Sequence, residues 1–526
     1  MQLQSIFENV LLIIERCFST RNTFLFGSML AAIVLTILFY TGVLPLSVEY
    51  FLFYSFIILL ACLARPSWMF LFFVTLLPLE IISVTPVDFG FDLRPYQWVG
   101  GFLGIALGIR FITGRLVRPF FRWHIIDTVF VILFSGIALA GIVGQSVALK
   151  QTVVVGSFLF LYFLSRLFLR QWQDVKQALF FFLLSASLVL LWGISQNILF
   201  FLGYGHFSIM PGRPNGTLIE PDWLGLFCLF LLAPALWWLK ERLVNNFVLK
   251  ALLFPLSFLL LIFTTLIITV SRSAWLGAVV LLGSFLVLVF YEKNKGFAFR
   301  PALLLIECLG IIFGVALVLV ETIPLTRFAL IDRAGSVASQ SQTITIACDG
   351  SMNPPQYVNT ADELAQYGCQ HILLEEKDAR LAEGKLVMTI ERPDPNVNIR
   401  KMIYGVSWTA IKAHPVTGIG WGNIGPKLGL DERGASYNAS NLFLELWLGG
   451  GIVALTAFMT FVGGVLFMSY GMWKRAVMPP VAAPLLAILA GFLVFNLFNT
   501  GLLLGFIWVW FALLPLLFPS RSKNIT

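Results

Sequence analysis

Apolar stretches long enough to cross a lipid bilayer recur along almost the whole chain of 526 residues. Each holds roughly 20 residues, which as an α-helix spans the hydrocarbon core of a membrane. Hydrophobic residues make up 59% of the chain and charged residues 12%, whereas soluble domains carry about 25% charge. Long apolar runs, rather than the alternation typical of a membrane β-barrel, therefore predict an all-α polytopic membrane protein.

The apolar runs predict about 14 transmembrane helices, within a range of 12–14. The last apolar block, residues 481–519, is too long for one helix and contains a turn signal at Asn499, Thr500 and Gly501. Charged residues within positions 1–17 suit a helix at the membrane interface better than a cleavable signal peptide. The expected spans are 23–43, 47–63, 68–85, 96–113, 125–144, 153–169, 177–202, 222–239, 251–270, 274–291, 302–320, 442–469, 481–498 and 502–519.

Lysine and arginine are distributed unevenly between the two sets of short connections. One set carries twenty of them, and the other carries four, which are Arg94, Lys150, Arg213 and Arg272. Because cytoplasmic loops are enriched in these cations, we expect both termini in the cytoplasm of a plasma or inner membrane. The net charge of +8 is then explained by cytoplasmic loops and anionic lipid rather than by nucleic acid.

This orientation divides the chain into three parts. Residues 1–320 form an N-terminal bundle of about eleven helices, residues 321–440 a large extracytoplasmic loop, and residues 441–526 about three further helices. Strand-like "TITIAC" and "KLVMTIERPDP" and helix-like "NTADELAQYG" predict a small α+β insertion at about 334–396. Cys348 and Cys369 enclose part of this insertion on the oxidising side of the membrane. A disulfide between them and two unpaired cysteines are both open alternatives.

A polar, glycine-rich stretch follows an expected surface helix in the same loop. Residues 399–413 have apolar positions at helical spacing and favour an amphipathic helix on the membrane surface. The sequence "HPVTGIGWGNIGPK" comes next, from His414 to Lys427. Its glycines permit a backbone nest that holds an anion, and the alternative is a tight turn that returns the chain to the bilayer.

Three blocks of sequence, in this order and on one side of the membrane, resemble the O-antigen ligase and polymerase family. They are "SRSAWLG" at 271–277, with Arg272 followed by Leu276, "HPVTGIGWGNIG" from His414, and "SNLFLELWLGGGIVAL" at 440–455. "RPNGTLIEPDWLGLF" at 213–227 is similar to a fourth family segment. The similarity covers roughly residues 200–460, and the N-terminal helices agree only in being apolar.

The resemblance implies a GT-C-like membrane glycosyltransferase that takes a glycan from a polyprenyl-pyrophosphate donor to a lipid or saccharide acceptor. Arginines match phosphate oxygens and stay protonated, so they suit a diphosphate leaving group. The expected catalytic residues are Arg272, Arg213, His414 and Ser440. The expected substrate-binding residues are Arg400, Gly418, Gly420, Gly422, Asn423, Asn441 and Glu445. No cofactor and no metal are expected.

The chain departs from the family at one expected site residue. The third block of the family begins His-Asn, whereas here Ser440 precedes Asn441. Serine is not a base near neutral pH, so either another group takes the proton or positioning matters more than proton removal. His414, Tyr437, Asp431 and Glu432 are the nearby candidates, and His414 alternatively caps the preceding helix.

Each residue assignment has a structural alternative, and so does the function. Arg213 and Arg272 are alternatively interfacial arginines that reach lipid headgroups. Asp88 and Asp92 suit a helix cap or an ion pair with Arg94 better than a metal site. A ligase and a polymerase are not separated by the sequence, and a glycolipid transporter or a non-catalytic glycolipid binder is a further alternative. No inverted repeat is visible, which disfavours the transporter.

Overall fold

The computed structural model describes most of the chain. The described residues are 21–518 apart from 116–121, 211, 246–248, 291–298, 324, 327–329, 331–340, 350–354, 360, 373–376, 394 and 431–435. The interfacial helix expected in residues 1–17 and the candidate bases Asp431 and Glu432 lie outside the described residues.

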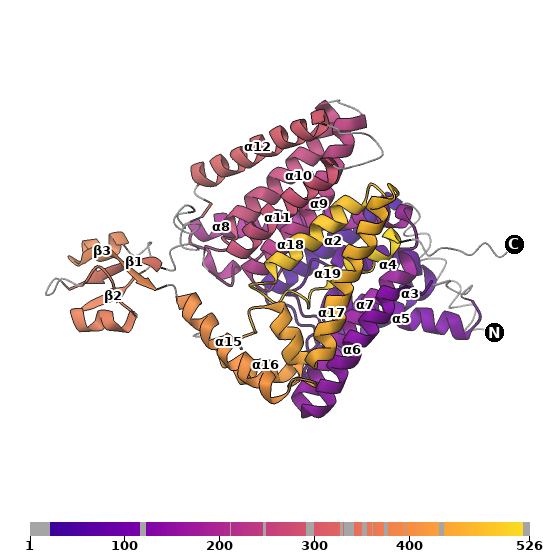
Figure 1. Ribbon diagram of the computed structural model, residues 1–526, viewed down its shortest axis with the longest axis horizontal. Helices are drawn as coiled ribbons and strands as arrows, with labels where there is room; N and C mark the ends of the chain where they lie inside the picture. Colours follow the sequence, from indigo (N-terminus) through magenta and orange to yellow (C-terminus); the bar gives the residue numbers. More distant parts are fainter. Residues whose placement is uncertain are drawn as a thin grey trace.

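The described residues form a helical bundle (Figure 1). Within them, nine helices are long and apolar enough to cross a membrane, and four shorter apolar segments accompany them. The all-α polytopic fold is therefore confirmed. The elements of the bundle are α2 (Arg21–Tyr40), α3 (Val48–Ala64), α4 (Pro66–Leu76), α5 (Pro95–Ile112), α6 (Ile125–Val143), α7 (Gln145–Phe168), α8 (Trp172–Phe201), α9 (Pro221–Asn245), α10 (Leu249–Ile268), α11 (Arg272–Phe290), α12 (Phe299–Thr322), α17 (Leu442–Lys474), α18 (Ala482–Phe495), α19 (Gly505–Phe511) and the 3-10 turn η6 (Leu514–Leu517).

One expected span is only partly helical. Helix α4 ends at Leu76, and residues 77–94 continue as irregular chain, with one 3-10 turn, η1 (Val87–Phe89), instead of the helix expected to residue 85. Pro78 lacks an N–H and disfavours helical geometry in the residue before it, which explains the break. Much of the segment is buried, and the backbone of Glu80 and Ile81 donates to the Thr217 carbonyl. Irregular backbone at this depth is tolerated because protein surrounds it.

Glycine contacts bring two pairs of helices close together. On α6, a Cβ added to Gly136 would lie 2.9 Å from the Gly450 carbonyl oxygen on α17. On α11, a Cβ added to Gly277 would lie 3.0 Å from the Gly491 carbonyl oxygen on α18. Small residues at such crossings let helix backbones approach in a membrane, where packing rather than the hydrophobic effect drives association. These contacts fix α17 against α6 and α18 against α11 (Figure 1).

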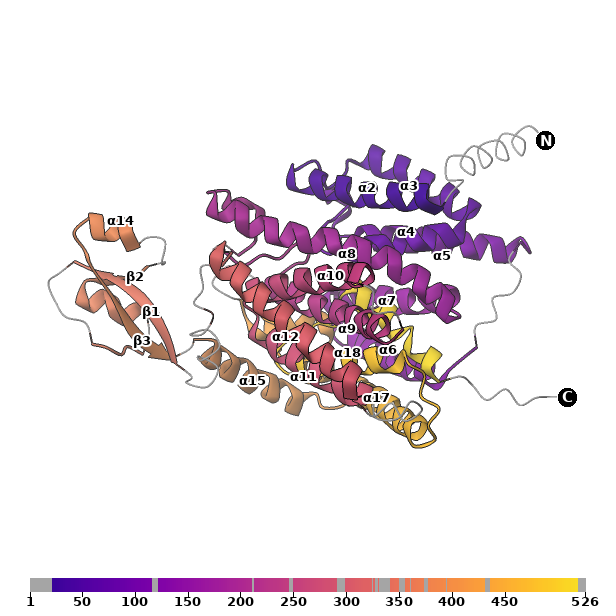
Figure 2. The same cartoon turned by 90° about the horizontal axis from the view of Figure 1, so that it is seen from above.

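The large loop contains a separate small sheet. Strand β1 (Ser341–Cys348) lies between β2 (Cys369–His371) and β3 (Leu386–Pro393), and both pairings are antiparallel. The 3-10 helix η3 (Ala361–Tyr367) and the short helix α14 (Lys377–Ala382) complete it. Ile344, Ile346, Leu364 and Ile390 are in its own small core, and Cys348 and Cys369 form a disulfide. Figures 1 and 2 show this unit at one end of the molecule, beside the bundle.

A long helix leads from the sheet back to the bundle. Helix α15 (Pro395–Ala413) runs from the sheet along the bundle in both views (Figures 1 and 2). Ile403, Ala410 and Ile411 are buried on one side of it, while Lys401 and Lys412 are exposed. The 3-10 turn η5 (Trp421–Asn423) and the short helix α16 (Ile424–Leu428) follow. An amphipathic helix of this kind covers the bundle with its apolar face.

Candidate functional site

The turn between α18 and α19, residues 496–504, lies at the meeting point of several distant segments, and we name it the central turn. Asn496 is fully buried, and its side-chain oxygen accepts a hydrogen bond from the Gly501 backbone N–H at 2.6 Å. Its side-chain nitrogen donates to the Phe492 carbonyl at 2.9 Å. One asparagine therefore ties the end of α18 to the far side of the turn and holds its shape.

The start of α17 and the helix α15 bind this turn through its carbonyl groups. The Asn441 side chain donates to the Leu497 carbonyl at 3.0 Å, and the Leu442 N–H donates to the Asn496 carbonyl at 2.9 Å. The Arg400 guanidinium is 3.4 Å from the Phe498 carbonyl oxygen and 5.6 Å from the centre of its ring. Asn441 and Arg400, both expected site residues, are thus brought to one segment.

The residue after Arg272, Ser273, contacts the central turn. Asn499 of the central turn donates from its side chain to the Ser273 hydroxyl at 2.7 Å. Ser273 and Arg272 are the first two residues of α11, so this bond fixes the end of the helix that carries the arginine. Val270, just before it, has a positive φ of 52°, which marks the sharp reversal between α10 and α11.

Arg213 lies against that reversal. Its Nε donates to the Thr269 carbonyl at 3.0 Å, and its Nη2 is 3.4 Å from an oxygen of Asp222. Thr269 is three residues before Arg272, so the structure brings Arg213 to the turn that carries Arg272. The Arg213 side chain is only 14% exposed, so its charge is largely shielded from bulk solvent. Its attraction for an anion is stronger in such an environment than in water.

An apolar groove begins one helical turn below Arg272. Its space is about 1210 Å³, including its open side, between α10, α11 and α12. Trp275, Val279, Leu282 and Leu286 of α11 line it. Their spacing of three and four residues continues from Arg272, so the arginine is at the head of the groove-lining face. The arrangement suits an amphiphile with an apolar chain and an anionic end.

The block from Ser440 to Glu445 shapes the start of α17. The Asn441 side-chain oxygen caps the helix by accepting from the Phe443 and Leu444 N–H groups, at 3.0 and 3.1 Å. The buried Glu445 carboxylate accepts from the Ala439 N–H at 2.7 Å. Ser440 lies between them with a positive φ of 49°, a strained conformation for a serine. Asn441 and Glu445 thus hold Ser440 in this conformation beside the central turn.

The glycine-rich loop, residues 414–425, is packed at a helix crossing. A Cβ on Gly418 would lie 2.5 Å from the Leu448 carbonyl oxygen, and a Cβ on Gly422 would lie 2.3 Å from the Val147 carbonyl oxygen. A Cβ on Gly420 would lie 2.6 Å from the Ala148 Cβ. The Asn423 side chain donates to the Gly144 carbonyl at 2.9 Å. This close packing between α6, α7 and α17 explains the residue types at four positions where we expect substrate binding. They are Gly418, Gly420, Gly422 and Asn423.

His414 lies at the opposite end of α15 from Arg400. His414 directly follows the last residue of α15 and is fourteen positions after Arg400, which corresponds to about 21 Å along the helix axis. His414 is exposed, and its backbone carbonyl accepts from the Gly418 N–H at 2.9 Å. The structure therefore gathers Arg213, Arg272, Arg400, Ser440, Asn441 and Glu445 around the central turn and leaves His414 with the glycine-rich loop.

The comparison with known proteins identifies part of the chain. Residues 256–459 match the family model described as O-antigen ligase. The chain carries an O-antigen ligase domain. This agrees with the family resemblance of its sequence blocks and supports a place in the O-antigen ligase and polymerase family. No curated protein and no solved structure matches the chain.

The O-antigen ligase domain contains only part of the gathered site. It includes Arg272, Arg400 and the block from Ser440 to Glu445, whereas Arg213 and the central turn lie outside the matched residues. Among the described residues, no group of three or more His, Cys, Asp or Glu is arranged to hold a metal ion. The described part of the site offers guanidinium groups, amides and the Ser440 hydroxyl as polar groups.

Sequence reasoning missed the central turn and a charge pair near it. The sequence indicates only a turn at Asn499, and for Asp88 and Asp92 it favours a helix cap or an ion pair with Arg94. Arg94 instead pairs with the buried Glu80, with 3.1 Å between Arg94 Nε and a Glu80 carboxylate oxygen. The other Glu80 oxygen accepts from the Gly505 N–H at 2.7 Å. The available signal was the presence of polar residues within apolar blocks, where such residues tend to be paired or functional.

Proposed function

We propose that the protein is an O-antigen ligase-like glycosyltransferase of the cytoplasmic membrane. It transfers a glycan from a polyprenyl-pyrophosphate donor to an acceptor hydroxyl on the outer face, in the assembly of a cell-surface polysaccharide. The O-antigen ligase domain supports the family, and the family implies lipid-linked glycans and membrane lipids as partners in general. The observation that carries the finer proposal is Arg272 at the head of an apolar groove, with Arg213 hydrogen-bonded to the turn just before Arg272.

The groove and the arginines fit the two halves of such a donor. The polyprenyl chain occupies the groove between α10, α11 and α12, and its diphosphate lies at the Arg272 end. The acceptor oxygen forms a bond to the anomeric carbon while the bond from that carbon to the diphosphate oxygen breaks. Negative charge grows on the departing diphosphate, and fixed cations directed at this charge supply on the order of 3 kcal/mol per donor.

The proton of the acceptor hydroxyl is the second requirement of the reaction. Ser440 occupies the position of the family histidine, and its hydroxyl is not a base at neutral pH. We propose that Ser440 and Asn441 orient the acceptor beside the central turn, and that the proton leaves with the departing diphosphate or through solvent. Positioning of this kind converts a bimolecular encounter into a reaction between fixed groups, which is worth several kcal/mol.

A polymerase that adds repeat units to a growing glycan is the second candidate. It uses the same type of donor and the same leaving group, and the matching family model is compatible with both activities. The two differ in the acceptor, which is a lipid or saccharide other than the polyprenyl carrier in the ligase reaction and a polyprenyl-linked glycan in the polymerase reaction. The ligase and polymerase reactions leave different lipids attached to the glycan product. Separation of the products by their attached lipid therefore distinguishes the two activities.

The test is transfer from a radiolabelled polyprenyl-pyrophosphate glycan by the purified protein in lipid nanodiscs, with EDTA present. Wild type, Arg272→Ala, Arg213→Ala and the control Arg475→Ala are compared, since Arg475 is an exposed arginine at the end of α17. We expect losses of about 100-fold for the first two variants and wild-type transfer for the control. Undiminished transfer by Arg272→Ala, or a requirement for metal, contradicts the proposal.

A further inference from the structure

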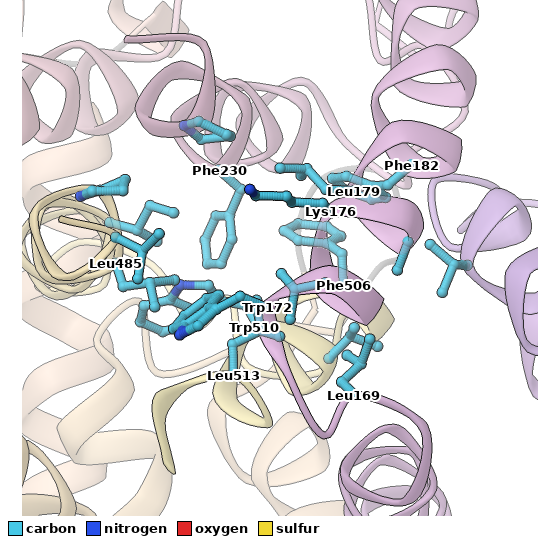
Figure 3. Close-up of a pocket in the computed structure, with 18 of the residues that line it drawn as sticks. Leu169, Trp172, Lys176, Leu179, Phe182, Phe230, Leu485, Phe506, Trp510 and Leu513 are labelled. Carbon is cyan, nitrogen blue, oxygen red and sulfur yellow. The ribbon is translucent and has the colours of Figure 1, made fainter. Parts of the chain in front are cut away.

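An apolar cavity lies between α8, α9, α18 and α19 (Figure 3). Its space is about 930 Å³, including its opening, and its lining includes Phe182, Phe230, Leu485, Phe506 and Leu513. On α18 it reaches Pro484, near the helix end opposite the central turn. That end belongs to the side where the charge pattern predicts the cytoplasm. The cavity is therefore separate from the groove below Arg272, which begins at the predicted outer side.

A charged recess continues from the cavity. The recess shares Lys176, Leu179, Pro234 and Trp237 with the cavity and adds Glu241 and Arg242. Figure 3 shows Lys176, from the second turn of α8, among the aromatic side chains of the lining. Two cations and one carboxylate give the recess a net positive charge. An occupant with a long apolar part and an anionic end matches both compartments.

Two indole N–H groups in the lining have no acceptor among the described residues. They belong to Trp237 and Trp510, and both nitrogen atoms are buried. Trp510 itself is only 5% exposed. A buried donor without a partner costs free energy, and a buried tryptophan N–H usually finds an acceptor. Oxygen acceptors on a ligand in the cavity would satisfy these two donors.

We infer that this cavity binds an anionic phospholipid from the membrane leaflet on the predicted cytoplasmic side. An acyl chain enters the apolar cavity through its opening, and the phosphate lies in the recess with Lys176 and Arg242. The ester carbonyl groups, which lie between chains and phosphate in every diacyl phospholipid, accept hydrogen bonds from Trp237 and Trp510. The inference does not depend on the proposed transfer reaction, because it uses another cavity at the opposite end of the helices.

The first test measures which lipid the purified full-length protein binds. Delipidated protein in detergent is titrated with phosphatidylglycerol or with phosphatidylcholine of the same acyl chains, and bound lipid is counted by native mass spectrometry. We expect phosphatidylglycerol to bind at least about fivefold more tightly, and Lys176→Gln to remove roughly that factor without changing phosphatidylcholine binding. The control Lys474→Gln changes an exposed lysine outside both compartments and leaves the preference intact.

The second test concerns the indole donors. Trp510→Phe keeps one aromatic ring in the lining. It removes the indole N–H together with the second ring of the indole. We expect about fivefold weaker binding of both lipids, and the unfolding temperature of the lipid-free variant measures separately the loss of ring packing. Equal affinity of the wild type for the two lipids overturns the inference, as does unaltered binding by Trp510→Phe. Displacement of phosphatidylglycerol by polyprenyl phosphate at equal concentration also overturns it, in favour of an isoprenoid site.

Discussion

At the scale of single residues, the charge pair beneath the site shows how a membrane protein keeps ions in its interior. Glu80 is fully buried, and the Arg94 side chain is 20% exposed. The carboxylate accepts from the Tyr96 hydroxyl at 2.9 Å and from the Gly505 N–H at 2.7 Å, so its hydrogen-bonding capacity is well used. Such a pair contributes little when intact, and removal of one partner leaves an uncompensated charge.

Glu80→Gln tests this charge pair. The substitution keeps the volume but leaves the partly buried Arg94 without its charged partner, so we expect a loss of about 3–5 kcal/mol in unfolding free energy. The double variant Glu80→Gln/Arg94→Gln loses less than the sum of the two single variants, because the two sites are coupled. Unfolding in detergent measures both effects. Additive losses contradict a direct pairing. Glu383→Gln serves as the control, because Glu383 pairs with Arg380 at the surface. We expect this control to lower the unfolding free energy by at most about 1 kcal/mol.

At the scale of elements, the glycine-rich loop and the kink of α17 form one packed unit. Gly451 has a positive φ of 65° within α17, and a Cβ there would lie 1.9 Å from the Val416 carbonyl oxygen. The Ile419 N–H donates to the Leu448 carbonyl at 2.7 Å, and the Trp447 indole donates to the Pro415 carbonyl at 2.9 Å. The loop therefore sets where α17 bends and, through that bend, where Ser440 and Asn441 lie.

Gly451→Ala is expected to disrupt this packed unit. The new methyl group meets backbone atoms, and the positive φ disfavours any side chain, so we expect a loss of at least about 3 kcal/mol. Gly463→Ala is the matched control, because Gly463 lies in the same helix with nothing within 4 Å of its Cβ position. That substitution leaves stability unchanged or raises it by up to about 1 kcal/mol. Similar thermal midpoints for the two variants contradict the packing described.

The disulfide of the inserted sheet is a second element with a testable energy. The small core around Ile344 and Ile390 is too limited to stabilise a unit of this size by burial alone. Cys348 and Cys369 are 21 positions apart, and closure of such a loop stabilises a fold by about 3 kcal/mol. We expect the double variant Cys348→Ser/Cys369→Ser to be cleaved within residues 341–393 by a protease that spares wild type. Cys308→Ser, at a free cysteine of α12, is the control, and equal protease resistance of all three proteins contradicts the expectation.

The elements also show what local sequence can and cannot predict. The strands near residues 341 and 386 and the helix from residue 395 follow local patterns, and they lie close to their expected positions. The early end of α4 follows from Pro78, whose influence an otherwise apolar run conceals. The central turn has no local signature beyond a few polar residues, because its role comes from partners such as Asn441 and Ser273, which are distant in the chain. Contacts over such separations are not encoded in any single window of sequence.

At the scale of the whole molecule, the sidedness of the membrane remains a prediction from charge. The inserted sheet and α15 lie at one end of the molecule (Figures 1 and 2), and twenty cations against four assign that end to the outside. In a background without free cysteines, Gln370→Cys in the sheet should react with a membrane-impermeant maleimide in intact cells. Lys474→Cys should react only after the cells are opened. The reverse pattern contradicts the predicted orientation.

The central claim also concerns the whole molecule, because the proposed site requires Arg213, the turn before Arg272, the central turn and the groove to lie together. The most direct measurement is the single-turnover rate of glycan transfer from saturating donor by Arg272→Ala and Arg272→Lys. The account predicts a chemical step slowed about 100-fold in Arg272→Ala and partly recovered in Arg272→Lys, while donor affinity changes less. A chemical step of wild-type rate in Arg272→Ala, whatever happens to donor affinity, would contradict it.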